Sequence, residues 1–147
     1  MKYFWVAILS FACISCSGDP YNGHPPQPVS GQVLINGEPA KGASIIFHHE
    51  GDWGTRSIVP QATCDQEGKF VMSTYSQNDG APEGEYKIAL SWPAYRTKKA
   101  SPDKLNGKFS DPKTSGLKVT IHPGKNELAP IEIKARVLDI KLDTKHK

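Results

Sequence analysis

Brief apolar runs separated by turn-forming residues follow one another from Val29 onward, at intervals of roughly 8 to 14 residues. Such spacing is typical of an all-β sandwich or barrel. Sustained helical periodicity is absent from the sequence, so we expect no helix in this region. The pattern predicts seven strands, or eight if the C-terminal end adds one, at the following runs: Val29–Ile35, Ala43–Phe47, Ser57–Cys64, Lys69–Tyr75, Tyr86–Ser91, Leu117–Ile121 and a last strand from about Glu127.

Turn residues indicate how these strands are connected. Asn36-Gly37 suits the left-handed angles of a tight hairpin turn. Asp65-Gln66-Glu67-Gly68 has a side-chain acceptor at its start and glycine at its end, and it predicts a hairpin between the strands on either side. Pro60 inside the third run indicates an edge strand or a bulge. The apolar residues change parity near Val137, so we expect a bulge or a break in the last strand there.

The N-terminal region has the pattern of a secretion signal. Met1-Lys2 is positively charged, and the apolar run Tyr3–Ile14 is shorter than the ~20 residues that a membrane-spanning helix needs. The following Cys13-Ile14-Ser15-Cys16 resembles a bacterial lipobox, in which a small residue precedes the cysteine that becomes lipidated. We therefore expect residues 1–15 to be a lipoprotein signal peptide and Cys16 to carry the lipid. Cys13 is the alternative position, and an ordinary secretory leader is the alternative interpretation.

The expected domain organisation follows from composition. Residues 16–28 contain four prolines and two glycines but almost no aliphatic side chains, which predicts a tether between anchor and domain. Residues 29–137 form the β-sandwich domain, and residues 138–147 are a C-terminal tail or an extra strand. A chain of 147 residues has room for one such domain. Its net charge of +3 is spread over mixed basic and acidic positions, so we expect no nucleic-acid partner.

The order of several short motifs resembles the opening of carboxypeptidase regulatory-like domains. These motifs are Val29-Ser-Gly-Gln-Val33, Asn36-Gly-Glu-Pro39, Gly42-Ala-Ser-Ile-Ile-Phe47, Asp65-Gln-Glu-Gly-Lys-Phe70 and Gly84-Glu-Tyr86. Lys108–Leu117 looks like a stretch found in small lipoproteins abundant in planctomycete bacteria. The resemblance implies a seven-stranded antiparallel sandwich of the immunoglobulin-like, transthyretin-like type. Its glycines meet the needs of turns and carry no chemistry.

Candidate chemistry is sparse in the sequence. The densest group of metal ligands is His48-His49-Glu50 with Asp52. Adjacent residues of a strand point to opposite faces, and zinc needs three or four converging ligands, so we expect no metal and no cofactor. If cleavage falls before Cys16 and the lipid occupies the sulfur of Cys16, Cys64 carries the only remaining thiol, which excludes an internal disulfide. We expect Cys64 to be a small buried core residue rather than a nucleophile, and the protein not to be an enzyme.

The longest irregular stretch, Trp92 to Gly116, is where we expect a partner to bind, because long loops in compact domains are usually functional or flexible. Candidate contact residues are Trp53, Trp92, Tyr95, Lys98 and Lys99. The aromatic side chains would form a platform, or alternatively pack against the core. The sequence thus predicts a non-catalytic protein of the cell envelope that is held to a membrane by its lipid and binds an envelope protein. The alternative is a carbohydrate-binding accessory module at the cell surface.

Overall fold

The computed structural model describes residues 18–53, 58–95 and 101–141, and in these ranges the chain is all-β. The expected signal peptide, with Cys13 and Cys16, lies outside the described residues, as do Lys98 and Lys99. No helix long and apolar enough to cross a membrane occurs in the three described ranges. The strands are β1 Pro26–Gln27, β2 Val29–Ile35, β3 Glu38–Pro39, β4 Ser44–His49, β5 Gln61–Thr63, β6 Lys69–Val71, β7 Ala81–Pro82, β8 Gly84–Ser91, β9 Lys118–Ile121, β10 Asn126–Glu127 and β11 Ile131–Ile133.

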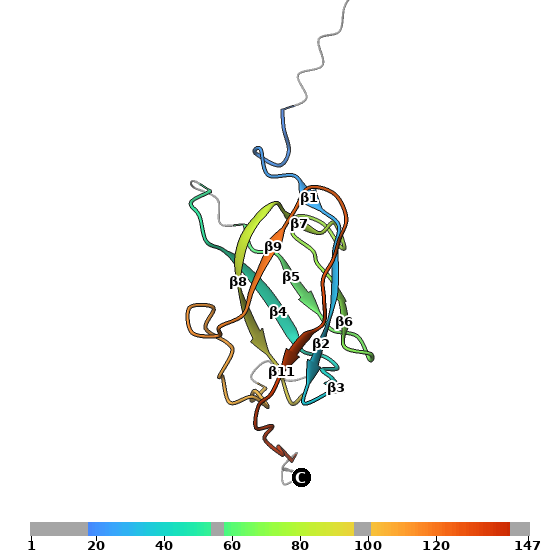
Figure 1. Ribbon diagram of the computed structural model, residues 1–147, viewed down its shortest axis with the longest axis vertical. Coiled ribbons are helices and arrows are strands. Elements are labelled where there is room, and N and C mark those ends of the chain that lie inside the picture. The colour runs from blue at the N-terminus through green and yellow to red at the C-terminus, as the bar shows by residue number, and fades with distance from the viewer. Residues whose placement is uncertain (1–17, 54–57, 96–100, 142–147) are drawn as a thin grey trace, which may run out of the picture.

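Two larger sheets and one small one make up the fold (Figure 1). The four-stranded sheet has the order β5-β4-β8-β9 and is antiparallel throughout. In the five-stranded sheet β2 is central, with β3 and β6 antiparallel on one side and β10 and β11 parallel to it on the other. The small sheet pairs β1 with β7. The expected all-β class with antiparallel strands is thus confirmed.

The parallel pairing corrects the expectation of a wholly antiparallel sandwich. β2 and the β10–β11 segment both start at the end of the domain where the N-terminal segment enters. The turn before β10 is fixed at that end, because the Gly124 N–H donates to Gln27 Oε1 at 2.7 Å. Two strands that start from the same end and lie side by side must run parallel. The described chain also divides into shorter strands than expected, since several runs pair over only two or three residues.

The hydrophobic core lies between the two larger sheets and is built from alternate strand residues. Phe47 is paired across strands with Ile88, and Ile45 with Leu90, and all four side chains are buried. Burying each such side chain contributes roughly 1.5–3 kcal/mol to folding. Tyr86 is also fully buried, and its hydroxyl is satisfied by donating to the Pro82 carbonyl oxygen at 2.7 Å. Burial raises the pKa of Tyr86.

The N-terminal segment packs against the domain earlier than the tether prediction implied. The Tyr21 ring lies 5.1 Å from the Tyr75 ring, and the Tyr75 hydroxyl donates to the His24 carbonyl oxygen at 3.0 Å. Gln27 then pairs with Ala81 as β1 joins β7. Within the expected tether of residues 16–28, the portion from Tyr21 onward therefore contacts the domain.

The stretch from Trp92 to Gly116 is an ordered covering of the sheet edge wherever the structure describes it. Leu105 and Phe109 are buried in the core cluster. The Leu90 N–H donates to the Phe109 carbonyl oxygen at 2.8 Å, and the Ser115 hydroxyl donates to the Ile88 carbonyl oxygen at 2.6 Å. These bonds satisfy the part of β8 that β9 leaves unpaired. Much of this stretch is thus structural, including Phe109 and Ser115 from the Lys108–Leu117 motif.

The C-terminal strand ends before the expected bulge near Val137. The last ladder residue is Ile133, and the residues after it are irregular. Asn36, in the tight turn after β2, takes over the pairing: its Nδ2 donates to the Ala135 carbonyl oxygen at 2.8 Å and its Oδ1 accepts the Ala135 N–H at 3.1 Å. The Asn36 side chain thus takes the place of one backbone pair of the sheet, and the tail leaves the sheet beyond this pair.

Candidate functional site

The histidine group at the end of β4 forms an aromatic cluster with no metal ligand set. Nδ1 of His49 accepts the Gly51 N–H at 2.9 Å, and the His49 ring stacks on Trp53 with centroids 3.8 Å apart. His24 of the N-terminal segment also stacks on Trp53, at 4.7 Å. His48 pairs across the ladder with Lys87. In the described part of the chain, no group of three or more His, Cys, Asp or Glu side chains could hold a metal ion.

Glu50 beside this cluster is held by two lysines. Its carboxylate lies 2.8 Å from Lys87 Nζ and 3.4 Å from Lys118 Nζ. The hydrogen bond from Lys87, and secondarily that from Lys118, lowers the pKa of Glu50 below its ordinary value. The pair of lysines thus keeps this carboxylate ionised, so it is poorly suited to donate a proton.

The candidate contact residues fall at opposite ends of the molecule. Trp53 lies by the end of the β4–β8 ladder where His49 pairs with Tyr86, whereas Trp92 follows Ser91 at the other end. Tyr95 lies beyond Trp92 along the same loop. The structure therefore does not bring Trp53 and Trp92 together into one platform, and Lys98 and Lys99 lie outside the described residues.

Trp92 and Tyr95 are both engaged by the protein itself. Nε1 of Trp92 donates to the Lys41 carbonyl oxygen at 2.9 Å, and Lys104 Nζ lies 4.3 Å from the centre of the Trp92 ring. The Tyr95 hydroxyl donates to the Ile140 carbonyl oxygen at 3.2 Å. Both aromatic residues are half-buried, so they fix the loop and the tail to the domain while keeping part of their surface exposed.

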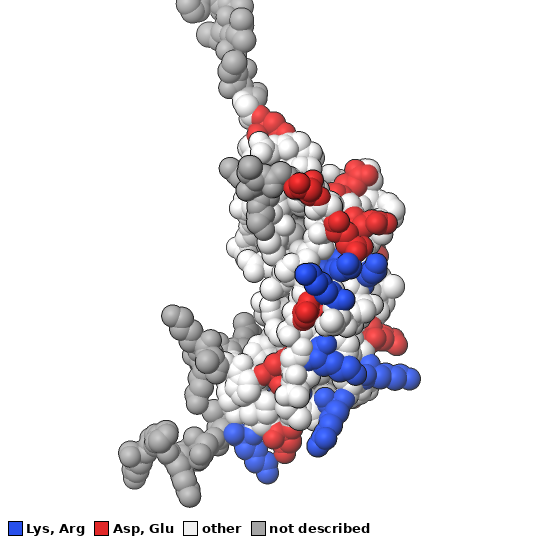
Figure 2. Space-filling view, turned by 90° about the vertical axis from the view of Figure 1, so that its left-hand side faces the viewer, with Lys and Arg blue, Asp and Glu red and all other residues white. Residues whose placement is uncertain are grey.

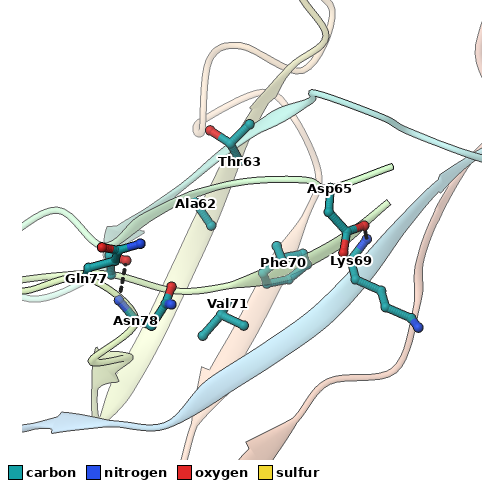
Figure 3. Close-up of a pocket in the computed structure, with 9 residues that line it drawn as sticks. Ala62, Thr63, Asp65, Lys69, Phe70, Val71, Gln77 and Asn78 are labelled. Atoms are coloured by element: carbon teal, nitrogen blue, oxygen red, sulfur yellow. Dashed lines mark hydrogen bonds between the residues drawn. The ribbon is translucent and has the colours of Figure 1, made fainter. Parts of the chain in front are cut away.

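A first groove, of about 320 Å³, lies in the expected hairpin (Figure 3). β5 and β6 belong to different sheets and are joined at two places only. Gln61 and Ser73 exchange backbone hydrogen bonds of 2.9 and 3.0 Å, and the Asp65 N–H donates to the Lys69 carbonyl oxygen at 2.8 Å. The register between these two places sets Thr63 opposite Val71, yet no hydrogen bond joins them. The hairpin is therefore closed at both ends and open in its middle.

The open middle of the hairpin offers little that would select a ligand. Ala62 and Thr63 lie along one strand and Phe70 and Val71 along the other, with Gln77 and Asn78 at one end of the groove and Asp65 and Lys69 at the other (Figure 3). Asp65 is already used by the turn, since its Oδ1 accepts the Glu67 and Lys69 N–H groups at 2.8 and 2.9 Å. Water satisfies free backbone groups of this kind as well as a ligand does.

A second groove, of about 410 Å³, lies at the opposite end from the N-terminal segment, between the loop after β8 and the C-terminal tail. The Leu138 N–H donates to the Lys104 carbonyl oxygen at 2.8 Å, which holds the tail against the loop. The groove residues are Ala94, Lys104, Val137, Leu138, Asp139 and Ile140. The sequence did not lead us to expect a binding surface on the C-terminal tail. The alternating apolar residues Leu138 and Ile140 were the signal that could have indicated one.

Charges are unevenly distributed along the molecule. On the face drawn in Figure 2, the part nearest the N-terminal segment carries Asp and Glu side chains. Lys and Arg side chains lie from the middle toward the C-terminal end, interspersed with single acids. Residues 134–141 contain three basic side chains and one acidic side chain. The end that holds the second groove therefore favours an anionic partner over a cationic one.

Cys64 is a core residue, as the sequence predicted. Its side chain is buried, and burial together with the nearby Asp65 carboxylate raises the pKa of the thiol to about 12. The thiolate is the nucleophilic form of cysteine, so Cys64 is almost entirely in its unreactive form at neutral pH.

Comparisons with known proteins give distant structural likenesses. No family model matches the chain, and no curated protein matches it. A DUF3823 family protein from Parabacteroides merdae ATCC 43184 is similar with a TM-score of 0.41 and 14% identity, over 78% of this chain and 47% of that one. A 9R-lipoxygenase from Cyanothece PCC8801 is similar with a TM-score of 0.39 and 12% identity, over 82% of this chain and 18% of that one. The chain thus spans about half the length of the first and about a fifth of the second.

Proposed function

We propose that the protein is a lipid-anchored, non-catalytic protein of the bacterial cell envelope that serves protein interaction or scaffolding. In this proposal its domain is a carboxypeptidase regulatory-like sandwich of the transthyretin-like type, and Cys16 carries the lipid. The motif order from Val29 to Tyr86 and the lipobox-like Cys13–Cys16 support these two parts of the proposal. A fold alone does not define a function, whereas the contact between the N-terminal segment and the domain limits how a lipid-anchored domain is oriented.

The observation that carries the proposal is the early contact of the N-terminal segment with one end of the domain. Tyr21 packs on Tyr75 and His24 stacks on Trp53. Tyr21 is five residues beyond Cys16, a length of chain that spans at most ~18 Å when fully extended. A lipid on Cys16 would therefore keep this end of the domain close to the membrane, and it would restrict how the domain is oriented.

The opposite end of the domain then faces away from the membrane. This end holds Trp92, Tyr95, the second groove and the described part of the C-terminal tail (Figure 1). Surfaces far from the anchor are the ones that another envelope protein can reach without displacing lipid. We therefore assign partner binding to the end of the domain around the second groove, and we call it the distal end.

Two measurements in the producing cell test the proposal. Metabolic labelling with a fatty-acid analogue should mark the wild-type protein and the Cys13→Ala variant but not Cys16→Ala. A photo-crosslinking residue at Val137, at the distal end, should capture one or two envelope proteins that the same residue at Tyr21, next to the anchor, does not capture. Label that persists in Cys16→Ala would refute the anchor. Equal capture from both positions, or from neither, would refute the assignment of the distal end.

A further inference from the structure

Residues 134–141 of the C-terminal tail cross the distal end without a helix, turn or bend, as an extended segment that is bonded on one side. The Leu138 N–H donates to the Lys104 carbonyl oxygen, and the Ile140 carbonyl oxygen accepts the Tyr95 hydroxyl. In an extended chain, the backbone groups of residues i and i+2 point to the same side, and those of the residues between them point to the other. Leu138 and Ile140 therefore turn their backbone groups toward the loop.

The backbone groups of Val137 and Asp139 are left free by this arrangement. Among the described residues, none forms a hydrogen bond with the backbone N–H or carbonyl oxygen of either residue. A row of free backbone groups on an extended segment is the feature to which another extended chain adds by β-augmentation. The Val137 side chain, 38% exposed, supplies an apolar contact beside that row.

The charges around this segment indicate the chemistry of its occupant. Arg136 and Lys141 are exposed on either side of the free backbone groups, and Lys104 lines the groove behind them. Asp139 is the single acid among residues 134–141. Arg136 and Lys141 form no ion pair with any described residue, so both are available to an anionic partner.

We propose that an extended acidic segment of a partner protein pairs with the backbone of Val137 and Asp139 along the edge of the tail that faces away from the loop, with its carboxylates against Arg136 and Lys141. This inference rests on the proposed function, because it names the partner chemistry of the same distal end. A peptide is favoured over an anionic polysaccharide because only a peptide supplies alternating N–H and carbonyl groups in register with those of the tail. Binding should be weak, because so short a pairing buries less than the ~1,200 Å² typical of stable interfaces.

The test uses the full-length protein in detergent micelles with two synthetic peptides, one of alternating Glu and Val and one of alternating Lys and Val. Hydrogen exchange with mass spectrometry follows the amides of residues 134–141, and fluorescence anisotropy follows labelled peptide. The Glu peptide should bind and protect these amides, and the Lys peptide should do neither. Equal binding of both peptides would overturn the charge complementarity, and Glu-peptide binding without protection of these amides would overturn the site.

Matched variants separate backbone pairing from charge. Asp139→Pro removes one free N–H, whereas Asp139→Ala keeps it and removes a repelling charge. The Glu peptide should therefore bind Asp139→Ala at least as well as wild type and should lose protection in Asp139→Pro. Arg136→Glu with Lys141→Glu should weaken binding by about tenfold, since two attractive charge pairs become repulsive. Lys113→Glu with Lys125→Glu, which reverses the same number of charges elsewhere, should leave it unchanged. Equal behaviour of the Pro and Ala variants would overturn the pairing.

Other occupants of this edge of the tail give distinct results. If residues 142–147 of the chain itself fill it, a protein ending at Lys141 binds the Glu peptide and the full chain does not, which would overturn a partner segment. If polygalacturonate binds this edge as well as the Glu peptide does, an anionic polysaccharide replaces the protein partner. If the peptide does not bind but crosslinks from Val137 persist in cells, the inference of an acidic partner segment is overturned. The proposed function is then unaffected.

Discussion

The Asp103 carboxylate accepts the Trp92 backbone N–H at 2.8 Å and so joins the two sides of the loop that follows β8. The same carboxylate also accepts the N–H groups of Leu105 and Gly107, at 3.1 and 2.9 Å. The Lys104 N–H in turn donates to the Trp92 carbonyl oxygen at 2.8 Å. One acidic side chain therefore organises the wall of the second groove and the turn that places Leu105 in the core.

Replacement of Asp103 should destabilise the fold. Asp103→Ala leaves three backbone N–H groups without their acceptor, and we expect a loss of about 2–3 kcal/mol in the free energy of unfolding, because hydrogen bonds to charged acceptors are the stronger ones. Asp103→Asn keeps one acceptor oxygen and should lose roughly half as much. Asp111→Ala is the control, since its side chain accepts one N–H, that of Lys113. Urea unfolding measures all three, and equal losses for Asp103→Ala and Asp111→Ala would contradict this role.

Gly80 is the position where the attachment of β1 is most sensitive to substitution. Its φ is +102°, and a Cβ there would lie 1.7 Å from the Gln27 carbonyl oxygen. Gly80→Ala should therefore separate β1 from β7 and lower the free energy of unfolding by at least about 2 kcal/mol. Gly124→Ala, at φ +89° but in open space, carries the backbone strain without the clash and should cost about 1 kcal/mol. Thermal unfolding compares the two variants. An equal shift in Tm would show that the clash of Gly80→Ala with the Gln27 carbonyl oxygen has no effect on stability.

Local features of the fold were predictable because each depends on neighbouring residues. The strand Val29–Ile35 matches β2, and the turn at Asn36-Gly37 has the positive φ values, 55° and 85°, that its sequence indicates. The parallel pairing of β2 with β10 and β11 was not predictable in this way. It joins residues about a hundred positions apart, and the alternating pattern of a strand specifies which face is buried but not which strand lies beside it.

The candidate site shows the same limit. Trp53 follows β4 and Trp92 follows β8. Neighbouring antiparallel strands have their C-terminal ends at opposite ends of the sheet. The antiparallel pairing of these two strands keeps the two aromatic residues apart, and that pairing is not visible in the sequence. The sequence of the loop after β8 likewise did not indicate that this loop is ordered. Asp103 fixes the loop by accepting backbone N–H groups, and these carry no sequence signal because every residue except proline has one.

Cys64 should resist thiol reagents in the native protein. Burial and the neighbouring Asp65 raise its pKa to about 12, from a reference value of 9.0. At pH 8 its thiolate fraction is then ~1,000-fold smaller than that of an unperturbed thiol, and alkylation should slow by about that factor or more. Iodoacetamide labelling of a Cys13→Ala/Cys16→Ala chain, which has this one thiol, measures the rate. The same chain in urea is the control, and a native rate near the urea rate would show that the thiol is accessible.

The carboxylate of Glu50 should give the native state a stabilising contribution that depends on pH. Lys87 and Lys118 hold its pKa below the reference value of 4.5, so the folded state binds this proton less readily than the unfolded state. The stabilisation is therefore complete above pH 4.5 and is lost as the pH falls through the lowered pKa. Glu50→Gln should lower Tm at pH 7 and have progressively less effect toward pH 3. A Tm difference that is constant over this range would contradict the linkage.

Contact between the N-terminal segment and the domain depends on Trp53. Its ring stacks on His24, whose carbonyl oxygen accepts the Tyr75 hydroxyl, so Trp53→Ala removes one of the contacts that hold this segment in place. Such stacking contributes roughly 0.5–1.5 kcal/mol, so hydrogen exchange at the His24 amide, which donates to the Tyr21 carbonyl oxygen, should accelerate by about two- to tenfold. Trp92→Ala is the matched control, because Trp92 bonds to Lys41 at the opposite end and should lower Tm without affecting that amide. If both variants accelerate exchange at His24 equally, the segment is released by general destabilisation, and Trp53 has no specific part in holding the N-terminal segment against the domain.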